Sequence, residues 1–443
     1  MPGKFFGGVH PAQNKSDSAK KEIRTPRSPE IVVIPMSMHV GAQCRPLVGK
    51  GDYVALGQII GDSDAPVSAP IHASVSGTVV AVEARPHPSG SRVLSVVIAN
   101  DFKDTPAGDP DVRTDVSDLS PESIADIIRS AGIVGLGGAA FPTHAKIRSG
   151  LGKVDTVIIN GAECEPYITS GYRGMLENGD ELLGGARIFR KIYGLESVTI
   201  AIEDNKADAI RHLKRLLPSS DNSIRIISLK TRYPQGAEKQ LIQTVTGRQV
   251  PPGGLPADVG CAVFNTDTAA AVYRAVYNGV PLTQKVVTVA GSAVASPVNL
   301  RVRIGTPFSE LFSACGGFKE TPRKIVMGGP MTGLAQHDLS APVIKGTNCI
   351  LALSDHECGR AVSERACIRC GRCIEACPMR LMPMLMYAYE QKGDLDELEK
   401  LNVTDCIECG CCGYICPGRL HLVQSFKTGK KKLAEKRAKE AAR

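Results

Sequence analysis

Two short segments near the carboxyl end of the chain carry the same cysteine spacing. The first run contains Cys367, Cys370, Cys373 and Cys377, and the second contains Cys406, Cys409, Cys412 and Cys416. Each run has gaps of two, two and three residues and ends in Cys-Pro, and together they hold eight of the fifteen cysteines. Short loops with two-residue gaps bring three thiolates to one metal group, so the fourth ligand must come from further away.

This spacing resembles that of bacterial two-cluster [4Fe–4S] ferredoxins. In those proteins the fourth cysteine of each run ligates the other cluster. The resemblance implies one cluster held by Cys367, Cys370, Cys373 and Cys416, and a second held by Cys406, Cys409, Cys412 and Cys377. Such a crossed arrangement joins the two halves into one unit that moves single electrons.

Zinc and disulfides explain this pattern less well. Structural zinc sites close four cysteines within one ribbon, usually as separated C-x2-C pairs. Disulfides would imply secretion, but residues 1–30 are polar throughout and do not resemble an export signal. Cys411 lies off the pattern, and we expect it to be a bystander.

Charge is distributed unevenly along the chain. The formal net charge is +8, and residues 427–443 alone contain eight Lys or Arg and two Glu. A solvated, fraying helix is the simpler interpretation of this tail, and contact with an anionic membrane surface is the alternative.

No apolar run reaches the roughly 18 residues that a membrane span requires. We therefore expect a protein of the reducing cytoplasm without a spanning helix.

The first third of the chain reads as short strands separated by glycine turns. Residues 50–61 and residues 69–82 both alternate apolar and polar residues. Together these two segments resemble the two halves of the barrel-sandwich fold of biotinyl and lipoyl carrier domains. A carrier needs an exposed Lys at the hairpin between the halves. The hairpin at residues 62–68 has no Lys, so a structural domain is expected.

Strand and helix signals alternate from about residue 120 to residue 280. A helix should begin after Ser120, which can cap it, with Pro121 at its first position. Apolar runs at 154–160 and 198–203 read as buried strands, and this rhythm favours an α/β sheet with helices on its faces. Residues 283–335 then follow a strand–strand–helix–Gly-Gly order that resembles the soluble-ligand-binding β-grasp domain, and residues 383–401, between the cysteine runs, read as helical.

A glycine-rich segment at residues 132–146 is the second strong signal. Because it follows a helix, it is not the ordinary dinucleotide-binding fingerprint. Its glycines still permit a turn whose N–H groups approach a phosphate or a flat ring, although such a loop alone is more often a tight turn. Polar segments at 160–167, 233–239 and 263–268 place further candidate residues near the ends of strands.

These segments resemble the flavin-binding subunit of respiratory complex I. The resemblance implies FMN contacts from the glycine-rich loop and its neighbours: Gly135, Gly137, Gly138, Ala139, Lys146 and Asn160. It implies a lining of the flavin and nucleotide pocket by Glu163, Glu165, Tyr233, Gly236, Glu238, Asn265 and Thr266, with Phe141 stacked on NADH. Leu136, Ala140 and Ala162 depart from the complex I pattern, which has Arg, Gly and Asp there, and this suggests a different branch.

The order of domains resembles that of the RnfC family, whose members belong to Rnf complexes, the ion-pumping ferredoxin:NAD⁺ oxidoreductases. The implied fold is multidomain α/β plus β: an N-terminal arm (1–30), a barrel-sandwich hybrid (31–103), an FMN/NADH-binding α/β domain (119–282), a β-grasp domain (283–345), an α-helical two-cluster ferredoxin-type domain (355–426) and a basic tail (427–443).

The resemblance implies an enzyme subunit that passes electrons between two [4Fe–4S] clusters and NAD(H) through non-covalent FMN. Its implied partners are other subunits of a membrane redox complex, including a ferredoxin-type subunit, with ferredoxin reached indirectly and no nucleic acid. Its implied location is peripheral, on the cytoplasmic face of the cell membrane. No general acid or base is required, because the cofactors carry the chemistry. The alternatives are a soluble dehydrogenase like cobalamin reductase, and an iron–sulfur subunit with an empty flavin pocket.

Overall fold

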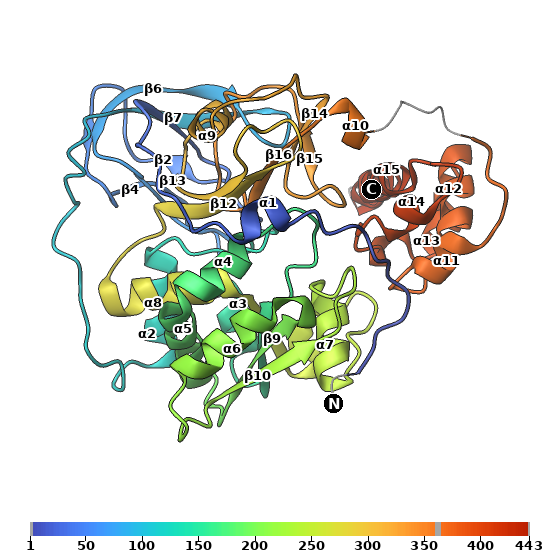
Figure 1. The fold of residues 1–443 in the computed structure, drawn as a ribbon, viewed down its shortest axis with the longest axis horizontal. Helices are drawn as coiled ribbons and strands as arrows, with labels where there is room; N and C mark the ends of the chain where they lie inside the picture. The colour runs from blue at the N-terminus through green and yellow to red at the C-terminus, as the bar shows by residue number, and fades with distance from the viewer. Residues whose placement is uncertain (1–2, 359–364, 442–443) are drawn as a thin grey trace.

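The computed structural model describes residues 3–358 and 365–441 as four folded parts and an N-terminal arm (Figure 1). A β-rich part in blue and a second β-rich part in yellow and orange lie together above a green α/β part. The red helical part containing both cysteine runs stands to one side. The parts therefore follow the order expected from the sequence.

The first part consists of two small antiparallel sheets. One sheet has the order β1-β7-β6-β3, and the other has the order β2-β4-β5. The strands are β1 (Ile31–Pro35), β2 (Arg45–Pro46), β3 (Tyr53–Val54), β4 (Ile59–Asp62), β5 (Ile71–His72), β6 (Gly77–Pro86) and β7 (Arg92–Asn100). The hairpin at 62–68 is tied down, since Ala42 N–H donates to Val67 O and Ser68 is fully buried. It has neither the Lys nor the freedom of a carrier hairpin.

The α/β part is built on a parallel sheet with the order β10-β9-β8-β11. Its strands are β8 (Thr156–Gly161), β9 (Val198–Glu203), β10 (Ile224–Leu229) and β11 (Cys261–Asn265). Its helices are α2 (Pro121–Ser130), α3 (Thr143–Gly150), α4 (Ser170–Glu177), α5 (Gly179–Ile192), α6 (Ala207–Leu216), α7 (Glu238–Thr246) and α8 (Thr266–Asn278), with 3₁₀ turns at Asp204–Lys206 and Pro256–Val259. Ser120 caps α2 as expected, accepting a hydrogen bond from Ser123 N–H.

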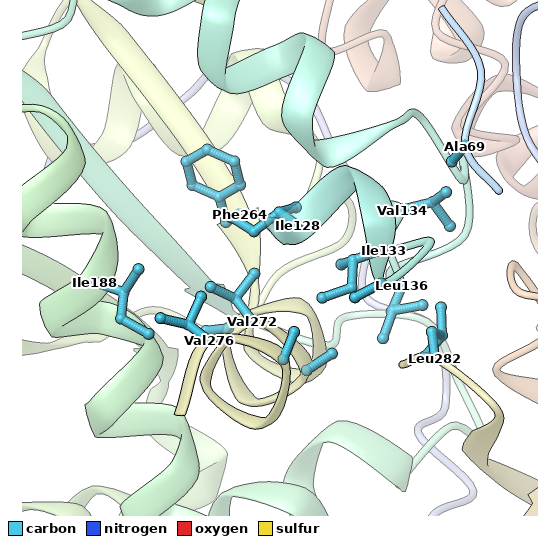
Figure 2. Close-up of a cluster of buried hydrophobic side chains, with 14 of the residues drawn as sticks. Ala69, Ile128, Ile133, Val134, Leu136, Ile188, Phe264, Val272, Val276 and Leu282 are labelled. Atoms are coloured by element: carbon cyan, nitrogen blue, oxygen red, sulfur yellow. The ribbon is translucent and has the colours of Figure 1, made fainter. Parts of the chain in front are cut away.

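One continuous apolar core joins this sheet to the glycine-rich segment. Phe189 of α5 stacks on Phe264 of β11 at 3.8 Å, and α8 packs against α5 so closely that a Cβ on Gly185 would lie 1.9 Å from Ala269 O. Figure 2 shows the same core continuing past α8 to Val134 and Leu136. The apolar residues of the segment are thus anchored in the core, while Gly137 and Gly138 at its tip are exposed.

The β-grasp part is a mixed sheet with the order β13-β12-β16-β14-β15. Its elements are β12 (Gln284–Ala290), β13 (Val298–Arg303), α9 (Phe308–Ala314), β14 (Lys324–Met327), β15 (Leu334–Gln336) and β16 (Cys349–Leu353), followed by α10 (Asp355–Cys358). The central strand β16 pairs in parallel with β12 and antiparallel with β14. It begins after residue 345, where the sequence placed the end of this domain.

The C-terminal part is helical. It contains α11 (Arg372–Ala376), α12 (Pro383–Lys392), α13 (Leu395–Lys400), a 3₁₀ turn at Val403–Asp405, α14 (Cys411–Ile415) and α15 (Leu422–Ala441). Gly393 ends α12 in the left-handed conformation and Asp394 caps α13, so the helical stretch expected at 383–401 is two helices.

The basic tail is docked rather than free. Helix α15 packs on α12 and α13, and its cations pair with carboxylates there: Lys432 with Glu390, Lys436 with Asp396, and Arg437 with Glu399. Lys430 pairs with Glu408 and also donates to Cys406 O at 2.6 Å. The expectation of a solvated, fraying helix is therefore wrong as far as Arg437, because five of the cations in residues 427–437 have partners brought close by the fold.

The N-terminal arm crosses between the α/β part and the C-terminal part (Figure 1). Gly3 N–H donates to Thr244 O, Val9 pairs with Tyr233 as a β-bridge, and Gly8 N–H donates to Ala376 O at 2.9 Å. The arm then forms the short helix α1 (Ser16–Ala19) and reaches the β-grasp part. Its last residues meet the first part, where Asn100 N–H donates to Glu30 O at 2.8 Å, so the arm contacts all four parts.

Candidate redox site

The carboxyl edge of the parallel sheet brings together two asparagines for which the sequence predicts a role in cofactor binding. Asn160 near the end of β8 is the register partner of Asn265 at the end of β11. Asn160 donates through Nδ2 to Gly236 O at 2.8 Å, and Asn265 caps α8 by accepting from Asp267 N–H at 2.9 Å. Thr266, the next residue, is buried in the first turn of α8. Ligands of open α/β sheets bind at this edge.

The glycine-rich loop lies over the same edge. Gly135 N–H donates to Phe141 O at 2.8 Å and closes the loop, while Gly137, Gly138 and Ala139 at its tip are exposed. A Cβ on Gly137 would lie 3.3 Å from Asn265, whereas Gly138, at φ +129°, has no atom within 4 Å of its Cβ position. Phe141 is 38% exposed beside the tip. The loop therefore offers bare backbone and one open ring to a ligand.

A cation stands beside this loop. Lys146 on α3 forms an ion pair with Glu238, the first residue of α7, and its Nζ lies 5.6 Å from the centre of the Phe264 ring. Both charged side chains remain partly exposed. Because Glu238 partly neutralises Lys146, a phosphate arriving here would compete with that carboxylate for the ammonium group.

Two buried lysines of the β-grasp part hold the loop from behind. Lys285 donates to Leu136 O at 2.9 Å, and Lys345 donates to Gly132 O at 2.7 Å and to Pro70 O at 2.6 Å. Burial lowers the pKa of Lys285 to about 8 and that of Lys345 to about 7. Sequence reasoning missed both residues, since neither lies in a motif and only the tertiary fold brings them to the loop.

Glu163 turns toward the amino end of α4. Its Oε1 accepts from Gly171 N–H at 2.7 Å and from Tyr172 N–H at 3.2 Å, and Lys15 of the arm lies 3.8 Å from its Oε2. Burial raises the pKa of this carboxyl. A helix amino terminus favours a carboxylate, so the protein satisfies Oε1, while the buried Oε2 has no hydrogen-bond partner among the described residues.

Glu165 and Tyr233 point toward the second cysteine run. Glu165 accepts from Met331 N–H at 2.8 Å and Thr332 N–H at 3.0 Å, and burial raises its pKa. The hydroxyl of Tyr233, a buried residue, donates to Cys409 O at 2.6 Å. Tyr233 therefore joins the α/β part to the second cysteine run, and Glu165 joins it to the β-grasp part. The flavin or nucleotide role implied for both residues stays a prediction.

The eight cysteines of the two runs line two separate cavities. Cys377, Cys406, Cys409 and Cys412 line the cavity nearer the α/β part, and we call this group the proximal site. Cys367, Cys370, Cys373 and Cys416 line the other cavity, and we call this group the distal site. Each cavity thus draws its fourth cysteine from the other run. Cys411 also borders the proximal cavity and is fully buried, with its sulfur 4.0 Å from Tyr233 O. Cys411 therefore packs beside the site, and its being a bystander to the metal group stays a prediction.

This donor set suits an iron–sulfur cage better than a single ion. In the described ranges, no three His, Cys, Asp or Glu side chains converge closely enough to hold one metal ion. The four irons of a [4Fe–4S] cage take one thiolate each, so the sulfurs must stand around a larger group. Burial raises the pKa of Cys377 and of Cys412, and that of Cys406 to about 11. Ionised thiolates there need the positive charge that iron supplies.

Family models match four successive segments of the chain. Residues 3–103 match the RnfC barrel sandwich hybrid domain, and residues 128–274 match the Nuo51 FMN-binding domain. Residues 286–335 match the SLBB domain, and residues 361–417 match the 4Fe-4S dicluster domain. Leu136, Lys146 and Asn265 thus fall within the FMN-binding segment, and both cysteine runs within the dicluster segment.

Two relatives, both RnfC-type subunits, match almost end to end. The chain is 45% identical over 440 residues to its counterpart in the Na⁺-translocating ferredoxin:NAD⁺ oxidoreductase complex of Acetobacterium woodii, covering 99% of this chain and 98% of the relative. It is 46% identical over 403 residues to its counterpart in the proton-translocating complex of Clostridium ljungdahlii, covering 90% and 88%.

A solved structure shares the fold at low sequence identity. A crystal structure of an NAD⁺-reducing [NiFe]-hydrogenase in the air-oxidised state superposes with a TM-score of 0.50 at 17% identity, covering 70% of this chain and 63% of that chain.

Proposed function

The chain belongs to the RnfC family of ion-translocating ferredoxin:NAD⁺ oxidoreductase complexes, and from that membership we propose that it is the subunit at which NAD(H) meets the complex. It carries an FMN-binding domain and a 4Fe-4S dicluster domain. A bound flavin supplies the exchange between two-electron hydride transfer and one-electron transfer. The residues of this chain bind, orient and shield the cofactors.

The glycine-rich loop and the sheet edge would hold the flavin. Exposed backbone at Gly137, Gly138 and Ala139 can approach a phosphate or a ring, and Lys146 brings a cation to the same rim. Asn160 and Asn265 present amides at the edge of the sheet. Phe141 is open for stacking against a nicotinamide ring. Lys285 and Lys345 act as positioning residues, because they fix the carbonyls on which the loop rests.

The proximal site would exchange electrons with the flavin domain, and the distal site would exchange them with a partner. One observation carries this order: Tyr233, from the segment that also supplies Gly236 and Glu238, donates to Cys409 O at 2.6 Å. The arm reinforces the contact, since Gly8 N–H donates to Ala376 O beside Cys377. Among the described residues, the distal site has no such contact with the α/β part.

Ion movement belongs to other subunits of the complex. Nowhere in the described residues does a helix have the length and hydropathy to cross a membrane. One relative is named for Na⁺ translocation and the other for proton translocation, at nearly equal identity to this chain. We propose that the chain is a peripheral subunit on the cytoplasmic face, with a ferredoxin-type subunit among its neighbours.

Reduction by NADH in the isolated subunit tests the proposal. The full-length protein, loaded with FMN and iron–sulfur clusters, should bind flavin near stoichiometrically and lose flavin absorbance when NADH is added. Electron paramagnetic resonance should then show reduction of the proximal cluster no later than the distal one. Clusters that assemble in a protein unable to bind FMN at any concentration would instead support the iron–sulfur subunit with an empty flavin pocket.

A further inference from the structure

The C-terminal part consists of two halves, a proximal half around the proximal site and a distal half around the distal site. The two halves have the same local backbone conformation. Arg369 and Glu408 occupy equivalent places in the two runs, with φ of +54° and +56°, and Gly371 and Gly410 follow with +78° and +83°. Helices α11 and α14 have the same length, and Arg380 and Arg419 repeat a third left-handed position. Equivalent residues can therefore be compared directly.

In the proximal half, each of these positions contacts a residue from elsewhere in the chain. A Cβ on Gly410 would lie 2.8 Å from Met331 O, and Cys411 is fully buried beside Tyr233. Glu408 pairs with Lys430, and Arg380 lies 4.9 Å from the ring of Phe6 in the arm. This face of the proximal half is an internal docking surface for the flavin and β-grasp parts.

In the distal half, the same positions are open. Gly371 has no atom within 4 Å of its Cβ position, and Arg372, the equivalent of Cys411, is exposed. Ile368 is 71% exposed, and the ligands Cys367 and Cys370 are exposed with it. Figure 1 shows α14 on the side toward the rest of the molecule and α11 further out. A surface that packs against a domain in one copy thus has no cover from the described residues in the other.

The open copy is strongly basic. We define the distal face as Arg365, Ile368, Arg369, Gly371, Arg372 and Arg419. Its four arginines are exposed, and none pairs with an acidic residue in the part of the chain that the structure describes. Arg365 and Arg419 lie on adjacent segments, since Arg365 N–H donates to Gly418 O at 3.1 Å. Glu375 on α11 is the one exposed carboxylate within the run itself.

We propose that the distal face docks an acidic iron–sulfur protein or domain, whose surface carboxylates pair with these arginines. The proposal rests on the proposed function, because it assumes that the distal site exchanges electrons with a partner. Four exposed arginines and one exposed isoleucine in the segments that carry the distal cysteines suit a protein partner, since arginine binds carboxylates through two parallel hydrogen bonds. Each encounter moves one electron between the partner's cluster and this chain, with no bond made and no proton transferred.

Stopped-flow oxidation of a reduced ferredoxin tests this docking surface. The full-length protein, loaded with FMN and clusters and supplied with NAD⁺, is mixed with a chemically reduced acidic two-cluster ferredoxin at several ionic strengths. The test variant is R372E/R419E, and R372K/R419K retains the charge. The matched control K431E/K439E changes two exposed α15 lysines that have no acidic partner among the described residues. R372Q/R419Q serves if the charge reversal disturbs folding.

For the unchanged protein, we expect the second-order rate constant to fall as salt rises. R372E/R419E should lower it by about tenfold or more at low salt and remove the salt dependence, with glutamine intermediate and lysine near the original rate. If R372E/R419E has the same second-order rate constant and salt dependence as K431E/K439E, the proposal is wrong. It is also wrong if the variant loses binding to phosphatidylserine vesicles while keeping its ferredoxin rate, because the occupant would then be a membrane.

Addition of NADH to the same variants separates the two proposals. A failure of NADH to reduce the loaded, unchanged protein contradicts the proposed function. The effect of charge reversal on ferredoxin oxidation is measured independently and still decides whether the distal face docks an acidic partner.

Discussion

The two cysteine runs have the same spacing and nearly the same backbone, yet they lie in opposite surroundings. The second run packs against Tyr233, Met331 and α15, whereas Cys367 and Cys370 of the first run are exposed. The residues between the cysteines account for the difference. The buried copy has the small residue Cys411 where the open copy has Arg372. A repeated ligand motif therefore fixes the metal chemistry, while its spacer residues decide what each copy touches.

The largest test of this comparison removes one crossed ligand from each site. C377S should lose the proximal cluster. NADH should then no longer reduce the distal cluster, because the electron carrier next to the flavin domain is missing. C416S should cost the distal cluster and leave the proximal one reducible. Iron analysis and electron paramagnetic resonance measure both. If C416S instead removed the cluster held by Cys406, Cys409 and Cys412, the crossed assignment would be wrong.

A smaller effect comes from adding one methyl group to equivalent glycines. Gly371 and Gly410 both have positive φ, so alanine costs each a similar conformational strain of about 1 kcal/mol. Only G410A also forces a methyl group to within 2.8 Å of Met331 O, which adds about 1–3 kcal/mol. Thermal loss of the clusters, followed by absorbance, should occur at a lower temperature in G410A. Equal midpoints for the two variants would mean that the covered face contributes nothing to stability.

A potential shift should follow removal of the cation next to the proximal site. Lys430 donates to Cys406 O at 2.6 Å, so K430M should lower the reduction potential of the proximal cluster. The expected shift is tens of millivolts, since about 1.4 kcal/mol corresponds to 59 mV for a one-electron couple. A redox titration measures it, with K431M as the matched control. An equal shift in both variants would assign the effect to net charge alone.

The smallest effect concerns Glu408 and Arg369, the charged residues at equivalent left-handed positions of the two runs. E408Q removes the ion pairs with Lys427 and Lys430, and because all three side chains are partly exposed the cost should be at most about 1 kcal/mol. R369Q removes no ion pair with a described residue and should leave the free energy of unfolding unchanged. Denaturant unfolding of the two variants compares them. A larger loss in R369Q would show that the distal face is not free.

Much of this architecture could be read from local patterns. The resemblance of the cysteine spacing to two-cluster ferredoxins implied the two groups of four that line the cavities, and Ser120 with Pro121 predicted the start of α2. Gly393 and Asp394 also carried a usable signal, a helix end followed by a helix cap, that would have split the stretch expected at 383–401. The two helix signals depend only on neighbours in sequence, whereas each cysteine group joins residues from both runs.

The remaining features depend on contacts across the fold. The carboxylate partners of Lys432, Lys436 and Arg437 lie about 40 residues away in sequence, so the charge run alone could not identify them. Lys285 and Lys345 reach the glycine-rich loop from another domain. The asymmetry between the cysteine runs likewise depends on Tyr233, Met331 and the arm. Spacing predicts ligands, but the surroundings of a site follow from the tertiary packing.

The arm also has a consequence for the order of assembly. Gly7 and Gly8 rest against Ala376 and Cys377, which are synthesised roughly 370 residues after them. A Cβ on Gly7 would lie 2.7 Å from the Cys377 backbone, so the arm can seat only after the loop around that ligand has its final shape. That shape depends on metal, because structural metal sites couple binding to folding. We therefore expect the arm to dock only after the cofactor has been inserted. A chain without iron would leave its first ten residues open to proteases.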